Sequence, residues 1–281
     1  MEKIALLPKE IKRLLEESYP LITRERVTKI EKVKGNEKNS HNYVVYTKKK
    51  KYLARRHLAL TKENAEIVLQ LISFCSRQGI KVPVVIENCR KELVTQKNDE
   101  HFTVFEFIEG NEFNGSQQQI MAVAREVARL HQVLKKYTGK LPNYRNSVYD
   151  ESGYANLTEK EMGQVSKELP AEEILFIKTE MEDLNKRRKT IKTDLSVMQP
   201  IHRDLHPKNI LFQSDEVAAI LDFDAIKMGA RILDVGFCGF RFAGKDLPQF
   251  IEEYERFNPL TTEEKATILF AVREEFLIRI N

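Results

Sequence analysis

The segment IHRDLHPKNILF, residues 201–212, places six strongly polar side chains within twelve positions that begin and end with apolar residues. In an ordinary buried strand or helix each of these groups would need a hydrogen-bond partner, because a buried polar group without one costs about 1–3 kcal/mol. The segment therefore predicts a loop that holds functional side chains between two short apolar stretches.

The spacing of the oxygen-bearing side chains narrows the chemistry of this loop. Asp204 and Asn209 lie five positions apart, and Asp222 follows at the end of the apolar run in AAILDFDAI. Two short strands would present all three side chains at the same edge. Phosphoryl transfer needs such a set, with one carboxylate for the attacking hydroxyl and oxygen ligands for Mg²⁺, a cation that shares its coordination with nucleotide phosphates.

The hydrophobic pattern predicts two regions of different structure. Residues 27–57 alternate as an antiparallel meander, and the segments KVPVVIEN and HFTVFEFIEG predict two more strands. A helix is expected between the meander and these two strands, with Thr61 as its N-cap and Gly79 as its end. After Gly110 the pattern is mainly helical, including residues 117–134 and 171–190. We therefore expect an N-terminal lobe at 1–108 and a C-terminal lobe at 109–281.

The composition of the chain limits where in the cell the protein is expected and which partners it is expected to bind. Hydrophobic residues make up 42% and charged residues 31% of the 281 residues, and no apolar run approaches the roughly 20 residues of a membrane span. The N-terminus, with its acids and proline, is a poor signal peptide, so a cytoplasmic protein without a membrane partner is expected. The basic runs at 48–51 and 186–189 are interpreted as a hairpin turn and a polar helix face, and nucleic acid is not expected as a partner.

HRDLHPKNILF followed by ILDFDAI resembles the family of the aminoglycoside phosphotransferases, choline kinases and homoserine kinases, which are relatives of the protein kinases. FEFIEG and VARLHQVL extend the resemblance over most of residues 27–240. The resemblance implies an α+β, two-lobed protein-kinase-like fold, with a small β-rich N-terminal lobe, a larger helical C-terminal lobe and ATP between them. It also implies that Asp204 is the catalytic base, that Asn209 and Asp222 hold Mg²⁺, and that the backbone from Glu106 to Ile108 binds adenine.

Other nucleotide contacts follow from the same resemblance. The family holds the ATP phosphates with a basic residue on the third strand, and strand alternation favours Arg55, with Arg56 as the alternative. Glu66 on the following helix is either the partner of Arg55 or an ordinary solvated helix glutamate. The loop that would cover the nucleotide, KGNEKNSHNY, has a single glycine, so phosphate binding there would also need polar side chains such as Ser40. His206 would contact the γ-phosphate or merely pack.

Several polar residues are expected to support the site. His202 is expected to prop the loop by hydrogen bonding, and His131 to be a satisfied core histidine. Asp224 is interpreted as either a second metal contact or a turn-forming residue. Asp234 is expected to cap or brace the helix that follows it.

The segment after DFD favours a small-molecule acceptor over a protein. Gly229 and Asp234 follow closely and no APE occurs, which leaves no room for an activation segment. We therefore expect a monomeric or homodimeric kinase that phosphorylates a small-molecule hydroxyl. A sugar or amino sugar is the first expectation, followed by an aminoglycoside, an amino alcohol such as homoserine, or a choline-like compound. The alternative is a catalytically silent nucleotide-binding or interaction protein on the same scaffold.

Overall fold

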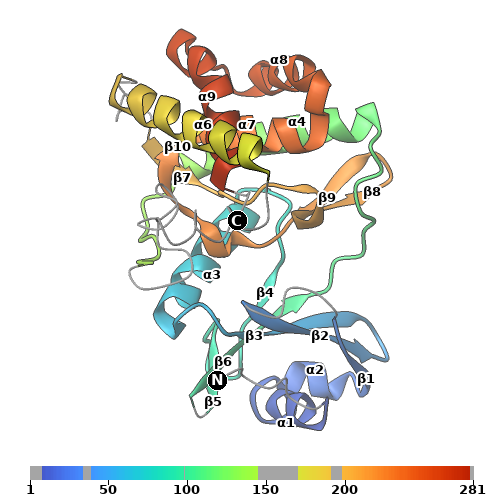
Figure 1. The fold of residues 1–281 in the computed structure, drawn as a ribbon. Helices are drawn as coiled ribbons and strands as arrows, with labels where there is room; N and C mark the ends of the chain where they lie inside the picture. Colours follow the sequence, from blue (N-terminus) through green and yellow to red (C-terminus); the bar gives the residue numbers. More distant parts are fainter. Residues whose placement is uncertain (1–7, 34–38, 98, 145–169, 191–197, 279–281) are drawn as a thin grey trace.

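The computed structural model describes residues 8–33, 39–97, 99–144, 170–190 and 198–278. An N-terminal lobe built on one sheet lies below a C-terminal lobe built on helices, with the short strands β7 to β10 between them (Figure 1). This division of secondary structure is the one that the hydrophobic pattern predicts. Within the described residues, none of the helices is long and apolar enough to cross a membrane.

The N-terminal sheet is antiparallel and has the order β1-β2-β3-β6-β4, with β5 also paired to β6. The strands are β1 (Val27–Lys32), β2 (Ser40–Thr47), β3 (Lys51–His57), β4 (Val85–Ile86), β5 (Thr95–Lys97) and β6 (Glu100–Glu106). The expected meander over 27–57 is thus confirmed. β3 is central in the sheet and pairs with β2 on one edge and with β6 on the other.

Alternation along β3 separates two faces with different neighbours. Tyr52 and Ala54 pack in a cluster with the helices α1 (Pro8–Ser18) and α2 (Pro20–Arg24). Leu53 packs instead against the core that includes α3 (Lys62–Arg77). Because side chains alternate along a strand, Arg55 shares the face of Leu53, and Arg56 shares the face covered by α1. Arg56 is buried there and forms an ion pair with Glu100.

The ends of α3 follow the local sequence signals. The Thr61 side chain accepts a hydrogen bond from the backbone N–H of Asn64, as an N-cap does. Gly79, at φ +81°, follows the last turn in a backbone conformation that favours glycine. Both predicted boundaries are confirmed.

Among its described residues, the C-terminal lobe has five long helices and two small antiparallel strand pairs. The helices are α4 (Gln117–Leu134), α6 (Ala171–Thr190), α7 (Arg231–Ala243), α8 (Leu247–Phe257) and α9 (Thr262–Ile278). The strands are β7 (Met198–Ile201) paired with β10 (Lys227–Ala230), and β8 (Ile210–Gln213) paired with β9 (Glu216–Ile220). One hydrophobic cluster runs from α3 through α4 to α7 and α8, so the two lobes share core residues.

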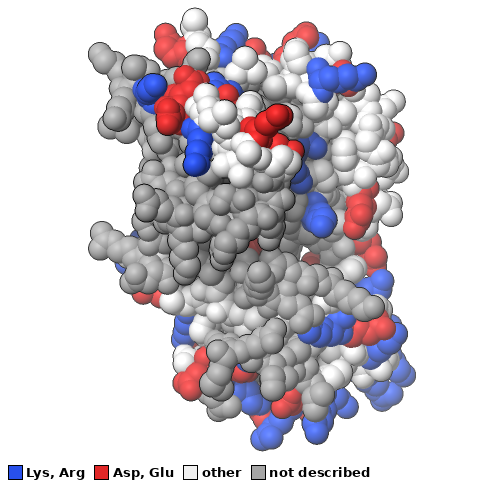
Figure 2. Space-filling model, viewed as in Figure 1, with Lys and Arg blue, Asp and Glu red and all other residues white. Residues whose placement is uncertain are grey.

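The lysine run at 48–51 forms the turn between β2 and β3, as interpreted from the sequence. Two of its side chains reach acidic residues at the connection between the lobes. The Lys50 ammonium lies 2.5 Å from Glu106, and the Lys51 ammonium lies 2.6 Å from Glu109. Figure 2 shows acidic side chains beside the basic ones over this lobe. The positive charge of the run is therefore partly matched by these carboxylates.

The burial of His57 in the N-terminal lobe can be tested through the pH dependence of the protein's stability. It is buried in β3, and its Nε2 lies 2.9 Å from the Thr103 hydroxyl. Burial first, and then the positive charges of Arg55 and His101, hold the pKa of His57 well below its ordinary value. An unfolded histidine takes up a proton near pH 6.5. Below that pH the unfolded state binds more protons than the folded state, so stability must fall as the pH falls.

We predict that the free energy of unfolding decreases between about pH 7.5 and about pH 5.5, by up to about 1.4 kcal/mol per pH unit for this group. In His57→Gln the decrease should be smaller, because glutamine does not titrate. Urea unfolding of both proteins at the two pH values measures the difference. Equal pH dependence in the two proteins would contradict the assignment.

Candidate active site

The loop between β7 and β8 carries the residues that the sequence singled out. It leaves β7 at Ile201, passes through a short 3₁₀ turn at Pro207–Asn209 and enters β8 at Ile210. Asp222 follows the end of β9, the partner strand of β8. The backbone N–H of Leu221 donates to the carbonyl of Asn209 at 2.8 Å, which ties the two strand ends together. Asn209 and Asp222 therefore lie at the same end of the hairpin, as expected.

His202 holds the loop from within. The ring Nε2 lies 3.0 Å from the carbonyl of Leu221 and must donate to it, which leaves Nδ1 to accept the backbone N–H of Asp204 at 3.2 Å. Burial lowers the pKa of His202, although the neighbouring aspartates oppose this shift. The ring is thus neutral and structural, and the prediction that His202 props the loop is confirmed.

Asp204 is held through one carboxylate oxygen. The Asn209 amide donates to its Oδ2 at 2.8 Å and to its backbone carbonyl at 2.9 Å. The Nε2 of His206 lies 3.4 Å from the same Oδ2, while Nδ1 of His206 accepts the backbone N–H of Lys208. These donors orient a carboxylate that stays 25% exposed. With its nitrogen turned to Asp204, Asn209 presents Oδ1 as its remaining amide oxygen.

Arg55 reaches from the N-terminal lobe to the residues that follow β9. Its Nη2 lies 2.6 Å from Asp224 and 3.3 Å from Asp222. Asp224 is buried, whereas the Asp222 side chain is 40% exposed. Asp222 has φ +60°, a left-handed conformation that is uncommon for any residue except glycine. The choice of Arg55 over Arg56 agrees with this geometry, since Arg56 lies on the opposite face of β3.

Of the two interpretations of Glu66, the structure shows the solvated helix glutamate and not the partner of Arg55. Glu66 forms its ion pair with Lys62, one turn earlier on α3, at 3.6 Å. Both side chains are more than a third exposed, as on any solvated helix face. Among the described residues the carboxylate that faces Arg55 most closely is Asp224. The sequence-based choice followed the helix that usually supplies this carboxylate, whereas here the loop after β9 supplies it.

Asp234 has a different role from the one expected. It lies inside the first turn of α7, and the N-cap position of that helix is Ala230. Its Oδ2 accepts the backbone N–H of His202 at 2.7 Å, and its Oδ1 accepts that of Arg203 at 2.8 Å. His131 adds a ring nitrogen at 3.2 Å. Asp234 therefore braces the catalytic loop rather than its own helix.

The charge of Asp234 depends on these donors. Burial raises the pKa of a carboxylate, but the hydrogen bond from His131, together with the backbone N–H of Arg203, outweighs burial and leaves the pKa of Asp234 below its ordinary value. The same hydrogen bonds hold Arg203 at φ +69°. Glycine adopts that conformation without cost, so the hydrogen bonds to Asp234 offset a backbone strain that an arginine carries here.

The remaining candidate nucleotide-binding residues lie in the N-terminal lobe and at its connection to the C-terminal lobe. The backbone N–H of Glu106 donates to Val84, and that of Phe107 lies 3.3 Å from the carbonyl of Lys51, so the chain continues past β6 beside the sheet. Within the described residues, the N–H of Ile108 has no such partner. Ser40 begins β2, is buried, and accepts a hydrogen bond from Asn42 at 3.4 Å. Residues 34–38 of the covering loop lie outside the described residues, as do residues 145–169.

The oxygen donors fit a hard divalent cation that also binds phosphate. Among the described residues no group of three histidine, cysteine or acidic side chains could hold a metal by itself. The amide oxygen of Asn209 and the carboxylate of Asp222 are the ligand types that Mg²⁺ prefers, and Mg²⁺ commonly takes only one or two protein ligands beside phosphates and water. The site thus fits a cation that arrives with a nucleotide.

Comparison with known proteins places this arrangement in a family. The model of the phosphotransferase enzyme family matches residues 29–266. A spectinomycin phosphotransferase, solved with ADP and spectinomycin, has 16% identity and a TM-score of 0.72, over 99% of this chain and 87% of that one. A microcompartment-associated aminopropanol kinase has 17% identity and a TM-score of 0.73, over 96% and 88%. An aminoglycoside phosphotransferase from Alicyclobacillus acidocaldarius has 15% identity and a TM-score of 0.70, over 99% and 86%.

At these identities the solved structures show the fold, which is the two-lobed fold expected from the motif. The family model covers most of the chain, including the sheet, the catalytic loop and the helices that support it. The chain belongs to the phosphotransferase enzyme family.

Proposed function

We propose that this protein is an ATP-dependent kinase that transfers the γ-phosphate to a hydroxyl group of a small molecule. The observation that carries the proposal is the orientation of Asp204 by Asn209 and His206, opposite the residues that Arg55 contacts. Phosphoryl transfer depends mainly on positioning and electrostatic stabilisation, and this set supplies a carboxylate for the hydroxyl and charged groups for the phosphates.

In the proposed reaction Asp204 accepts the proton of the acceptor hydroxyl. Its Oδ2 is occupied by donors, so the carboxylate is held in one orientation before the acceptor binds. Asn209 and Asp222 would hold Mg²⁺, which neutralises charge on the phosphate oxygens when it is bound. His206 and Arg55 add donors on either side, and the backbone from Glu106 to Ile108 binds adenine. The covering loop would contribute Ser40.

The proposed acceptor is a small molecule because the chain after Asp222 is short. It passes through one 3₁₀ turn, Phe223–Ala225, and β10 before α7 begins at Arg231. That leaves no segment that could bind an extended peptide. The neighbours named above act on or bind spectinomycin or aminopropanol by their names. We keep a sugar or amino sugar as the first acceptor class, then aminoglycosides, amino alcohols and choline-like compounds. A cytoplasmic monomer or homodimer stays a prediction.

The first prediction concerns Asp204. With ATP, Mg²⁺ and a panel of these acceptor classes, the wild type should turn over at least one class, and Asp204→Asn should lower kcat by about 10²- to 10⁴-fold, the usual contribution of a general base. Nucleotide affinity should change little, because Asp204 faces the acceptor. Coupled detection of ADP measures the rates. Full activity in Asp204→Asn would remove this residue from its role, and nucleotide binding without turnover of any acceptor would favour the silent alternative.

The second prediction concerns Asp222. Asp222→Asn should weaken ATP binding in the presence of Mg²⁺ by about tenfold or more, because loss of a metal ligand weakens metal binding at least as much as loss of an outer-shell partner. Binding in EDTA should change less, since the substitution then removes only a charge. Calorimetric titration under both conditions gives the comparison. Unchanged affinity with Mg²⁺ would show that Asp222 is not a metal ligand.

The third prediction concerns the partner of Arg55. A double-mutant cycle for ATP affinity with Arg55→Ala and Asp224→Ala should give a coupling energy of about 0.5–3 kcal/mol, as for residues in contact. The matched cycle with Arg55→Ala and Glu66→Ala should give a coupling near zero. Arg56→Ala should lower the unfolding temperature more than the ATP affinity. Coupling to Glu66 instead of Asp224 would restore the helix carboxylate as the partner.

A further inference from the structure

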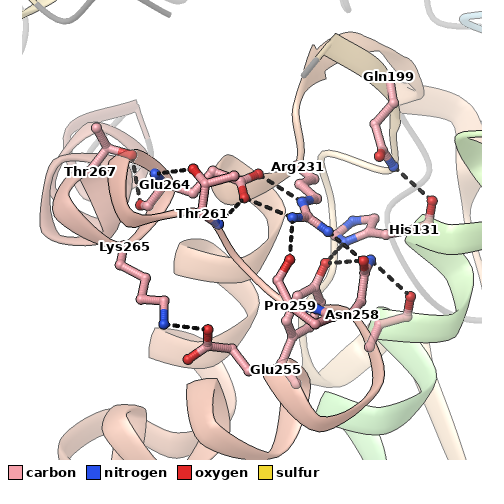
Figure 3. A network of polar contacts seen from close by, with 12 residues as sticks. His131, Gln199, Arg231, Glu255, Asn258, Pro259, Thr261, Glu264, Lys265 and Thr267 are labelled. Atoms are coloured by element: carbon pink, nitrogen blue, oxygen red, sulfur yellow. Dashed lines mark hydrogen bonds and ion pairs between the residues drawn. The ribbon is translucent and has the colours of Figure 1, made fainter. Parts of the chain in front are cut away.

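A chain of hydrogen bonds leads from the last helices of the protein to the catalytic loop. It begins at Arg231, the first residue of α7, which is largely buried. Its guanidinium makes two bonds of 2.7 Å to the carboxylate of Glu264, one of 2.7 Å to the carbonyl of Pro259, and one to Oδ1 of Asn258 (Figure 3). Arg231 is therefore fixed by the chain around the start of α9.

The direction of each following bond is set by the chemistry of its donor. A guanidinium only donates, so the Asn258 atom that faces Arg231 is its oxygen, and the Asn258 nitrogen faces the hydroxyl of Tyr254 at 3.1 Å. That nitrogen donates to Tyr254. The Tyr254 hydroxyl, having accepted one bond, donates its own proton to Nδ1 of His131 at 2.8 Å.

The last step connects His131 to Asp234. With Nδ1 accepting from Tyr254, the neutral ring carries its proton on Nε2, which lies 3.2 Å from Oδ2 of Asp234. Asp234 in turn holds the backbone of His202 and Arg203, directly before Asp204. Burial raises the pKa of Tyr254 above its ordinary value, so its phenol keeps the proton that this arrangement needs.

We propose that Tyr254 is a positioning residue for phosphoryl transfer, because its hydroxyl bonds Nδ1 and so holds the His131 ring in the orientation from which Nε2 donates to Asp234. This inference rests on the proposed kinase function. Tyr254 touches none of the reacting groups and acts through His131 and Asp234.

Burial of the surrounding side chains makes the Tyr254 hydroxyl difficult to replace. The side chains of Tyr254, His131 and Asp234 are at most 1% exposed, so water does not replace a lost donor easily. The carbonyl of His131 is also held, by the Gln199 side chain at 3.0 Å (Figure 3). Without the Tyr254 hydroxyl the proton stays on Nε2, because the Asp234 carboxylate only accepts, but Nδ1 becomes a buried acceptor without a donor. The ring is then held from one side only, which weakens its bond to Asp234 and loosens the backbone before Asp204.

The test compares Tyr254→Phe with Tyr137→Phe. Phenylalanine keeps the ring packed at position 254 and removes only the hydroxyl. Tyr137 is the matched control, because its hydroxyl donates to the carbonyl of Lys140 at the surface, away from this chain of bonds. Ring ¹⁵N NMR of His131 reports the tautomer without any substrate, and steady-state kinetics with the acceptor identified by the panel reports kcat and KM.

We expect all three proteins to show His131 protonated on Nε2. In Tyr254→Phe we expect the Nδ1 signal to shift toward that of an acceptor without a donor, the Nε2–H signal to shift as the bond to Asp234 weakens, and kcat to fall about tenfold, which corresponds to about 1.4 kcal/mol. KM for ATP should stay within about twofold, because the nucleotide side of the site is not altered. An unchanged Nε2–H signal, or an unchanged kcat despite a shifted signal, would overturn the proposal.

A second variant protects the test against misfolding of the first. In Asn258→Asp the nitrogen that donates to Tyr254 becomes an acceptor, so the Tyr254 hydroxyl is drawn away from His131 while Arg231 still faces an oxygen. The same shifts of the two ring nitrogen signals and the same loss of kcat are expected, and their absence would contradict the proposal. Absence of phosphoryl transfer by the wild type would instead overturn the kinase function, while the ring NMR would still show whether Tyr254 holds the His131 ring.

Discussion

The active site depends on a buried carboxylate that binds backbone N–H groups of the catalytic loop. An isolated carboxylate without water costs several kcal/mol, and the protein recovers this only if the charge is well hydrogen-bonded. Asp234 receives two backbone N–H groups from His202 and Arg203 and a ring nitrogen from His131. The loop therefore cannot move away from α7 without exposing an unpaired charge. This constraint also explains how Arg203 is kept at φ +69° without being glycine.

A second ionic contact fixes the loop after β9 against the N-terminal lobe. Asp222 and Asp224 would repel each other if they were both charged without a cation near them, and the Arg55 guanidinium lies within 3.3 Å of both. The Tyr144 hydroxyl lies 2.8 Å from the carbonyl of Asp224 and 2.7 Å from that of Ile226, on the other side of the turn. The turn is thus held from both lobes, and Asp222 stays in its left-handed conformation at the cleft.

The sequence predicted what depends on near neighbours in the chain. The capping of α3 by Thr61, the meander of β1 to β3 and the catalytic loop all follow from spacings of a few residues. The errors concern partners far apart in the chain. Arg55 finds its carboxylate 169 positions later in Asp224, and Asp234 binds backbone groups 31 and 32 positions earlier. No periodicity or cap signal distinguishes an aspartate that binds a distant backbone from one that begins a helix.

Four aspartates have four different roles in this part of the protein, and the roles differ with the exposure of each side chain to solvent. Asp234 is 1% exposed and surrounded by N–H groups, so its charge is used entirely within the protein. Asp224, 6% exposed, is matched by Arg55. Asp204 is 25% exposed and has one oxygen held by donors, and Asp222 is 40% exposed beside Arg55. The two more exposed carboxylates are those that a hydroxyl, a cation or a phosphate can reach. The charges of the buried pair, Asp234 and Asp224, are bound by groups of the protein and fix the loops on which Asp204 and Asp222 lie. Identical side chains therefore have structural roles where they are buried and can reach ligands where they are exposed.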